Sequence, residues 1–140
     1  MRPRIELLSW EEARADASPI RFQVFVAEQR VPADIELDEM DAQCLHAVAY
    51  ENAAPIATGR LLPDGHIGRM AVLKPWRGRG VGSAILAALM DAARRRGDAK
   101  IELSAQVHAV PFYLAHGFEP VGPVYEEAGI PHQAMTKALG

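Results

Sequence analysis

The sequence predicts an α/β (α+β) domain, in which a mixed, mostly antiparallel sheet has helices packed on its faces. Strand candidates outnumber helix candidates along the 140 residues. Segments 45–50, 56–62 and 66–73 follow one another as an antiparallel meander. The last of these strands, the long apolar helix 81–96 and a strand at 100–107 then come in a row, which indicates a right-handed crossover.

The first part of the chain contains one strand candidate and two helix starts. Residues 4–8 form the strand candidate. Ser9 is followed three residues later by Glu12, a capping-box pattern that predicts a short helix. Ser18-Pro19 predicts the start of another helix, with serine as the N-cap and proline at the first helical position.

The second part of the chain adds a helix and two short strands beyond the crossover. Pro111 starts a helix that reaches His116 and is closed by Gly117. Segments 118–121 and 131–139 are the remaining strand candidates. The meander, the crossover and these segments together give about six to seven strands.

Composition indicates one cytoplasmic domain over residues 1–140. Hydrophobic residues make up 49% and charged residues 24%, as in soluble globular proteins. The net charge of −3 argues against general nucleic-acid binding. No apolar run is long enough to span a membrane, no signal peptide precedes the first strand, and Cys44 is the single cysteine. We therefore expect no membrane partner and no internal disulfide.

A basic, glycine-rich turn precedes the long helix and predicts an anion site. Gly78, Gly80 and Gly82 lie where the helix begins, and the first N–H groups of a helix have no intrahelical partner. Those groups, with the partial positive charge of the helix end, favour a phosphate. Arg77 and Arg79 add full charges whose forked donors suit phosphate oxygens. The alternative is a glycine-rich helix start beside a basic surface.

Two familiar phosphate loops do not fit this turn. A P-loop requires a lysine after its last glycine, and none follows Gly80 or Gly82. In the dinucleotide fingerprint the third glycine comes one residue later than Gly82 does here. The missing lysine, together with the lack of a clear metal-ligating cluster, argues against a phosphotransferase.

Two motifs resemble the GNAT superfamily of acetyl-CoA-dependent N-acetyltransferases. Arg77-x-x-Gly80-x-Gly82 resembles the Arg/Gln-x-x-Gly-x-Gly/Ala motif that holds the CoA pyrophosphate in that family. Downstream, the family pattern is matched by Gln106, Ala109, Phe112-Tyr113 and Gly117-Phe118, although asparagine is commoner than glutamine at the first position. Segments 24–29 and 127–132 extend the resemblance over nearly the whole chain, to the YjcF-like and ElaA-like bacterial branch.

This resemblance implies the GNAT fold, with a parallel strand pair that splays apart to hold CoA. The pair consists of the 66–73 and 100–107 strands. It implies acetyl-CoA as cosubstrate and no metal. The residues expected to contact the cosubstrate are Met70, Ala71, Val72, Arg77, Gly78, Arg79, Gly80, Val81, Gly82, Ser83, Gln106, Phe112, Tyr113 and His116.

The resemblance also implies direct transfer of acetyl to a primary amine of a small molecule or a peptide. The N–H of Val72, with Ala71 as a second donor, would polarise the thioester carbonyl. Tyr113 would protonate the leaving thiolate and accelerate the reaction by ~10²–10³-fold. Glu28 is the first choice for the base that deprotonates the amine. The other candidate bases are Glu102, His66, His108 and His132.

Other outcomes remain open from the sequence. The chain could be a non-catalytic acyl-CoA sensor, and GNAT proteins are often homodimers. Five acids between Asp34 and Asp41 form either a solvated loop or an acidic rim that attracts a cationic amine. Cys44 and His46 could pass acetyl covalently, although a lone cysteine is more often a small buried hydrophobe and a strand histidine is more often structural.

Overall fold

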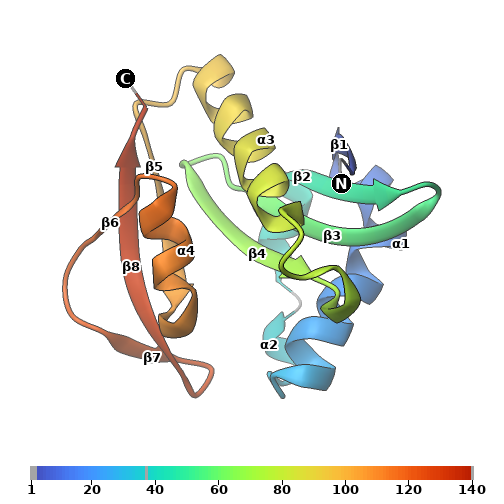
Figure 1. Cartoon of the computed structure of the whole chain (residues 1–140), viewed down its shortest axis with the longest axis horizontal. Coiled ribbons are helices and arrows are strands. Elements are labelled where there is room, and N and C mark those ends of the chain that lie inside the picture. Colours follow the sequence, from blue (N-terminus) through green and yellow to red (C-terminus); the bar gives the residue numbers. More distant parts are fainter. Residues whose placement is uncertain (1–2, 37, 140) are drawn as a thin grey trace.

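One mixed sheet runs through the molecule, in a computed structural model that describes residues 3–36 and 38–139 (Figure 1). The sheet has eight strands in the order β1-β2-β3-β4-β5-β8-β6, with β7 paired to β8. The strands are β1 (Arg4–Leu8), β2 (Leu45–Glu51), β3 (Ala54–Leu61), β4 (His66–Val72), β5 (Lys100–Gln106), β6 (Glu119–Pro120), β7 (Tyr125–Glu127) and β8 (Ile130–Ala138). The predicted mixed, mostly antiparallel sheet is confirmed.

The strand count exceeds the expected six to seven because of β7. This segment is only three residues long and reads Tyr-Glu-Glu, so it has no apolar alternation that would mark a strand. It exists because the turn at Ala128-Gly129, where both residues adopt positive φ, folds it back onto the start of β8. Its pairing partners are Ile130, Pro131 and His132.

The first helix is longer than predicted. The Ser9–Glu12 capping box starts α1 (Trp10–Arg21) as expected, but Pro19 lies inside α1 and starts no new helix. Proline removes one helical hydrogen bond near the end of α1, and the chain then widens into a π-helical segment, η1 (Phe22–Glu28). The helix α1 continues through Pro19 because its residues Ala13 and Ala17 are fully buried against β2.

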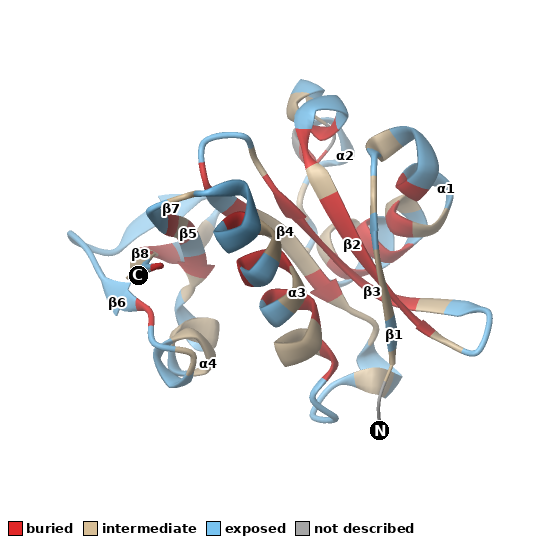
Figure 2. Ribbon diagram, turned by 90° about the horizontal axis from the view of Figure 1, so that it is seen from above, coloured by how far each residue is buried: buried red, intermediate tan, exposed pale blue. Residues whose placement is uncertain are grey.

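The long helix α3 (Val81–Arg96) and α1 cover opposite faces of the sheet. Consecutive residues of β2, which point to opposite faces, show this. Ala47 packs in the core cluster that contains α3, and Val48 packs in the cluster that contains α1. In Figure 2 the buried residues of α3 lie toward the strands. At Gly59 of β3 an added Cβ would come within 2.9 Å of the Ile85 side chain, so glycine permits the close contact between α3 and β3. The predicted bounds of α3 are confirmed.

The parallel pair β4–β5 splays apart, as the GNAT resemblance implies. The two strands pair only at His66–Glu102 and Ile67–Leu103. After these pairs, β4 loses its regular register with β3 between Thr58 and Arg60, opposite Arg69, which has φ 49°. A bulge of this kind bends a strand and increases its twist. The rest of β4 therefore diverges from β5 and leaves a gap in the middle of the sheet (Figure 1).

The remaining helical segments flank this gap. They are α2 (Ala33–Glu36), the short 3₁₀ turns η2 (Glu39–Gln43), η3 (Lys74–Trp76) and η4 (Val107–Ala109), and α4 (Val110–Ala115). No helix among the described residues is long and apolar enough to cross a membrane.

Candidate functional site

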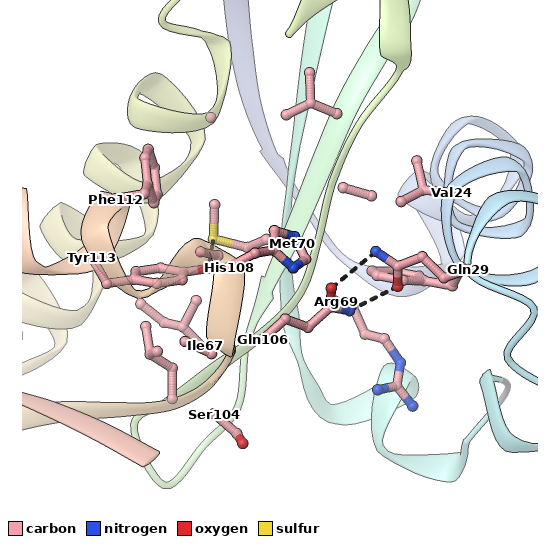
Figure 3. Close-up of a pocket in the computed structure, with 18 of the residues that line it drawn as sticks. Val24, Gln29, Ile67, Arg69, Met70, Ser104, Gln106, His108, Phe112 and Tyr113 are labelled. Atoms are coloured by element: carbon pink, nitrogen blue, oxygen red, sulfur yellow. Dashed lines mark hydrogen bonds between the residues drawn. The ribbon is translucent and has the colours of Figure 1, made fainter. Parts of the chain in front are cut away.

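A cavity of about 960 Å³ occupies the gap between β4 and β5. It is within the size range of small-molecule and cofactor sites. Its walls come from η1, β4, the start of α3, β5, α4 and the turn between β7 and β8. Figure 3 shows side chains around this space, among them Val24 of η1, Met70 of β4 and Tyr113 of α4. Segments far apart in the chain thus form one site because the two strands separate.

The start of α3 forms one end of the cavity. Gly78 and Gly80 have φ of 75° and 81°, a left-handed backbone conformation that glycine adopts without strain. Gly80 is the N-cap residue, and no side chain caps the first turn of the helix. Val81, Gly82 and Ser83 follow and also line the cavity. The first N–H groups of a 16-residue helix are therefore available to an anion.

The two loop arginines are held by protein groups. The guanidinium of Arg77 donates from Nε to the Val72 carbonyl at 2.8 Å and makes two bonds of 3.0 and 2.9 Å to the Glu28 carboxylate. Arg79 stacks over the ring of Trp76 at 5.4 Å and is not part of the cavity wall. The positive charges of Arg77 and Arg79 therefore lie next to the start of α3. Arg77 also connects η1 to the end of β4.

The backbone of β4 presents one N–H group to the gap. Leu73 N–H donates to the Ile56 carbonyl of β3 at 3.0 Å. Successive N–H groups of a strand point to opposite edges, so that of Val72 points away from β3 and into the gap, whereas that of Ala71 points toward β3. The bond from Arg77 to the Val72 carbonyl lies on the same gap side. The Val72 N–H therefore faces the gap, as expected of the first donor, whereas that of Ala71, the expected second donor, does not.

Tyr113 points into the cavity from α4 (Figure 3). Its ring packs edge-on against Phe112 at 5.0 Å and against Phe118 at 5.7 Å. Its hydroxyl donates to Met70 Sδ at 3.7 Å, a weak acceptor. Burial raises the pKa of Tyr113 to about 12. The phenol therefore keeps its proton at neutral pH and can donate it to a ligand.

Gln106 and Gln29 form an amide pair across the cavity. Gln29 Nε2 donates to Gln106 Oε1 at 3.1 Å, and Gln106 Nε2 donates to Gln29 Oε1 at 2.7 Å (Figure 3). The pair joins η1 to the end of β5 over a sequence separation of 77 residues. Gln106 was expected at the site and lines it. Gln29 was not among the residues expected at the site, because its role depends on a partner far along the chain.

His116 is the predicted contact that lies furthest from this arrangement. Its Nδ1 is 2.8 Å from the Phe112 carbonyl, so Nδ1 carries the proton and donates it. Its ring lies 4.6 Å from the Phe112 ring and lines no part of the cavity. His116 thus supports Phe112 from behind.

The candidate bases lie at different places. Glu28 is paired with Arg77 and borders a separate shallow pocket with Gln23 and Lys74. His66 lies at the paired end of β4, where its ring contacts Asp64 at 3.0 Å and Glu102 at 3.3 Å. His108 and His132 both line the cavity, as does His66. The structure therefore groups three histidines around the cavity and leaves Glu28 outside its wall.

The acidic segment is neither a solvated loop nor a simple acidic rim. Arg21 is fully buried and bonds the Glu36 carboxylate at 2.5 Å and both Asp41 oxygens at 2.8 and 3.0 Å. Arg60 bonds Asp38 at 2.7 and 2.8 Å and Asp41 at 2.9 Å. The sequence interpretation failed because each partner arginine lies on a distant element. Asp34 and Glu39 alone of the five acids are exposed.

Cys44 and His46 do not form a reactive pair. Cys44 is buried ahead of β2, its thiol donates to the Met40 carbonyl at 3.1 Å, and burial raises its pKa. His46 is buried, with Nε2 2.9 Å from the Asp41 carbonyl, and burial lowers its pKa. Neither lines the cavity. His46 is thus the structural histidine that was expected, and the geometry gives the covalent route no support.

Among residues 3–36 and 38–139, no group of three or more histidine, cysteine or acidic side chains is arranged to hold a metal ion. The groups that the cavity brings together are the start of α3, Val72, Tyr113 and the imidazoles of His66, His108 and His132.

Comparison with known proteins identifies the family. Residues 13–139 match the acetyltransferase (GNAT) domain family. The uncharacterized N-acetyltransferase YjcF of Bacillus subtilis is 42% identical over 131 residues, which cover 91% of this chain and 94% of that protein. The crystal structure of a putative N-acetyltransferase from Lactobacillus plantarum has a TM-score of 0.89 at 34% identity and covers 99% of both chains. That of Escherichia coli ElaA has a TM-score of 0.86 at 29% identity and covers 97% of this chain and 99% of its own. The chain belongs to the GNAT acetyltransferase family, in its YjcF- and ElaA-like bacterial branch.

Proposed function

We propose that this protein transfers the acetyl group of acetyl-CoA directly to a primary amine of a small molecule or a peptide. One observation supports this above the others. The gap between β4 and β5 joins three features in one cavity: the uncapped start of α3, the Val72 N–H and the Tyr113 hydroxyl. These could serve as an anion site, a carbonyl-polarising donor and a proton donor for a CoA thioester.

The start of α3 suits the pyrophosphate of CoA. At Gly80 an added Cβ would meet nothing within 4 Å, and at Gly82 it would meet Phe112 at 3.6 Å and Val72 at 3.7 Å. The backbone is thus open to close approach at the helix start. Uncapped N–H groups bind an anion by charge-assisted hydrogen bonds, which contribute about 1.5–3 kcal/mol each.

The thioester of bound acetyl-CoA supplies an activated acetyl group. The Val72 N–H, which faces the gap, would stabilise the charge that develops on the carbonyl oxygen. Loss of such a donor typically costs about 2.7–4 kcal/mol in the transition state. Tyr113, with its raised pKa, holds a proton beside the leaving sulfur. Val72 and Tyr113 both line the cavity. The strand β4 and the short helix α4 therefore position these two groups.

The acceptor must reach the thioester as a neutral amine. A lysine-like amine has a pKa near ~10.4, so its deprotonation at pH 7 costs roughly 4.6 kcal/mol, whereas an α-amino group near ~8 costs only about 1 kcal/mol. A basic acceptor therefore requires a base in the protein. The sequence proposed Glu28, but its bidentate bonds to Arg77 must first be released for it to act.

Calorimetric titration with acetyl-CoA tests the proposal first, with ATP and NAD as control ligands. We expect acetyl-CoA alone to bind. Thiol release from acetyl-CoA with a panel of primary amines then separates an enzyme from a non-catalytic sensor. Binding without thiol release for any amine would favour the sensor, and no binding would remove the proposed function. Analytical ultracentrifugation of the same sample tests for the homodimer that is common in the family.

A further inference from the structure

A histidine in the β7–β8 hairpin lies in the cavity wall and has one ring nitrogen held by a backbone carbonyl. His132 is 7% exposed and lines the cavity. Its Nδ1 lies 2.7 Å from the Ile130 carbonyl. A carbonyl only accepts, so Nδ1 carries the proton and donates it. In the neutral ring, Nε2 therefore carries the lone pair.

The nearest charged group leaves that lone pair accessible. Glu127 Oε2 lies 3.6 Å from Nε2, beyond ordinary hydrogen-bond distance. Glu127, like His132, lines the cavity.

The orientation of the ring is fixed from a second side. Tyr125 stacks on His132, with ring centroids 6.1 Å apart and planes inclined by 29°. The Tyr125 hydroxyl is in turn hydrogen-bonded to the Ser104 hydroxyl of β5. The imidazole is thus held by a backbone carbonyl, by a stacked ring and by the strand beneath it, as is typical of a positioned functional group.

The sheet register turns His132 toward the acceptor side of the gap. His132 pairs directly with Gln106 across β8 and β5. Directly paired residues project from the same face of a sheet. On that face Gln106 reaches η1 through its bonds to Gln29. His132 therefore lies on the face that η1 borders, and not on the face that carries α3 and its anion site.

We propose that His132 is the base that takes the proton from the acceptor amine, a role that depends on the function proposed above. His132 Nε2 takes one proton from the ammonium form of the acceptor and passes it to solvent water, which leaves a neutral, nucleophilic nitrogen. This nitrogen bonds to the thioester carbon, and the C–S bond breaks. The proton that the nitrogen then loses passes through water to the thiolate, which the Tyr113 hydroxyl stabilises as a hydrogen-bond donor. This assignment replaces Glu28, whose carboxylate is bound to Arg77.

The test compares two amines of nearly equal size and different basicity. Ethylamine is protonated at neutral pH, whereas 2,2,2-trifluoroethylamine is already neutral and requires no base to become a nucleophile. In His132→Asn the shorter amide can still donate to the Ile130 carbonyl, but nothing replaces Nε2. We expect this variant to lower kcat/KM for ethylamine by about 100-fold or more. The loss for trifluoroethylamine should be less than about tenfold.

His66→Asn is the matched control. His66 lines the same cavity but lies at the paired end of β4, and its ring is already engaged by Asp64 and Glu102. We expect this variant to preserve the ratio of the two kcat/KM values. An equal loss for both amines in His132→Asn would overturn the proposal, because it would indicate a structural role for the hairpin.

A measurement that needs no turnover separates failure of the base from failure of the enzyme. Nitrogen-15 NMR of the imidazoles should show His132 as the Nδ1–H tautomer in the absence of any amine. The Nε2–H tautomer would overturn the assignment even in an active enzyme. If wild-type protein binds acetyl-CoA but releases no thiol with any amine, the proposed function fails and the base with it, whatever the tautomer.

Discussion

Substitution of Tyr113 by phenylalanine is predicted to slow acetyl transfer by about 10- to 100-fold, less than a full general acid would imply. Burial raises the pKa of Tyr113 to about 12, whereas a thiol has a pKa near ~8.5. At ~1.36 kcal/mol per unit, complete proton transfer from the phenol to the thiolate is unfavourable by about 5 kcal/mol. Tyr113 therefore stabilises the departing thiolate chiefly as a hydrogen-bond donor.

The magnitude follows from this role. A hydrogen bond to a charged group contributes about 1.5–3 kcal/mol, which corresponds to a loss of roughly 10- to 160-fold when the donor is removed. Folding should hardly change, because the only protein acceptor of the Tyr113 hydroxyl among the described residues is the weak thioether of Met70 at 3.7 Å. We expect a change in unfolding free energy below about 1 kcal/mol.

Steady-state thiol release, measured as a function of pH, tests the size of the rate loss and the protonation state of Tyr113. Because the folded-state pKa is raised, Tyr113 stays protonated through pH 6–10, so the ratio of wild-type to Tyr113→Phe rates should remain constant over that range. Acetyl-CoA affinity should stay within about threefold of the wild type. A rate loss above ~1,000-fold would contradict the hydrogen-bond argument. An unchanged rate would reduce Tyr113 to packing against Phe112 and Phe118.

Three further predictions concern the loop, the ion cluster and the cysteine. Gly82→Glu should abolish acetyl-CoA binding in calorimetry. Gly82→Ala should fold normally, since its Cβ would lie 3.6 Å from the nearest side chain. Equal affinities of the two variants for acetyl-CoA would refute the loop assignment. Hydrogen bonds to Arg60 lower the pKa of Asp38 to about 2, so its stabilising contribution is complete above pH ~4 and lost as the pH falls toward 2. In chemical unfolding, the stability of Asp38→Asn should depend less on acid pH than that of the wild type. Identical pH dependences would contradict this prediction. Cys44→Ala should keep full turnover; a large loss of thiol release would revive the covalent route.

Local patterns predicted most elements well, because each is determined by neighbouring residues. The bounds of α3 follow from its apolar stripe and from Gly97, which takes the left-handed conformation at the helix end. Pro19 misled the prediction of a new helix start because tertiary burial of Ala13 and Ala17 outweighs one lost hydrogen bond. Capping signals alone cannot measure such burial.

Side-chain partnerships at long range were the part that could not be predicted. The Gln29–Gln106 pair and the ion pairs between Arg21 and the acidic segment depend on where the folded chain brings distant residues. For the same reason the sequence proposed Glu28 as the base, since nothing local shows that Arg77 holds its carboxylate. His132 appeared only as one of several candidates until the hairpin fixed its tautomer.

The acidic segment and the splayed strands are two parts of one arrangement. Arg69 adopts φ 49°, a conformation that costs a non-glycine residue about 1–2 kcal/mol. Its guanidinium donates from Nε to the Glu36 carbonyl at 3.3 Å and from the far end to Asp38 at 3.2 Å. These contacts offset the strain and hold the irregular point of β4, beyond which the strand leaves β5. The acidic segment therefore stabilises the bulge that opens the cavity, and Glu36 also lines the cavity, so substitutions in this segment would alter the site.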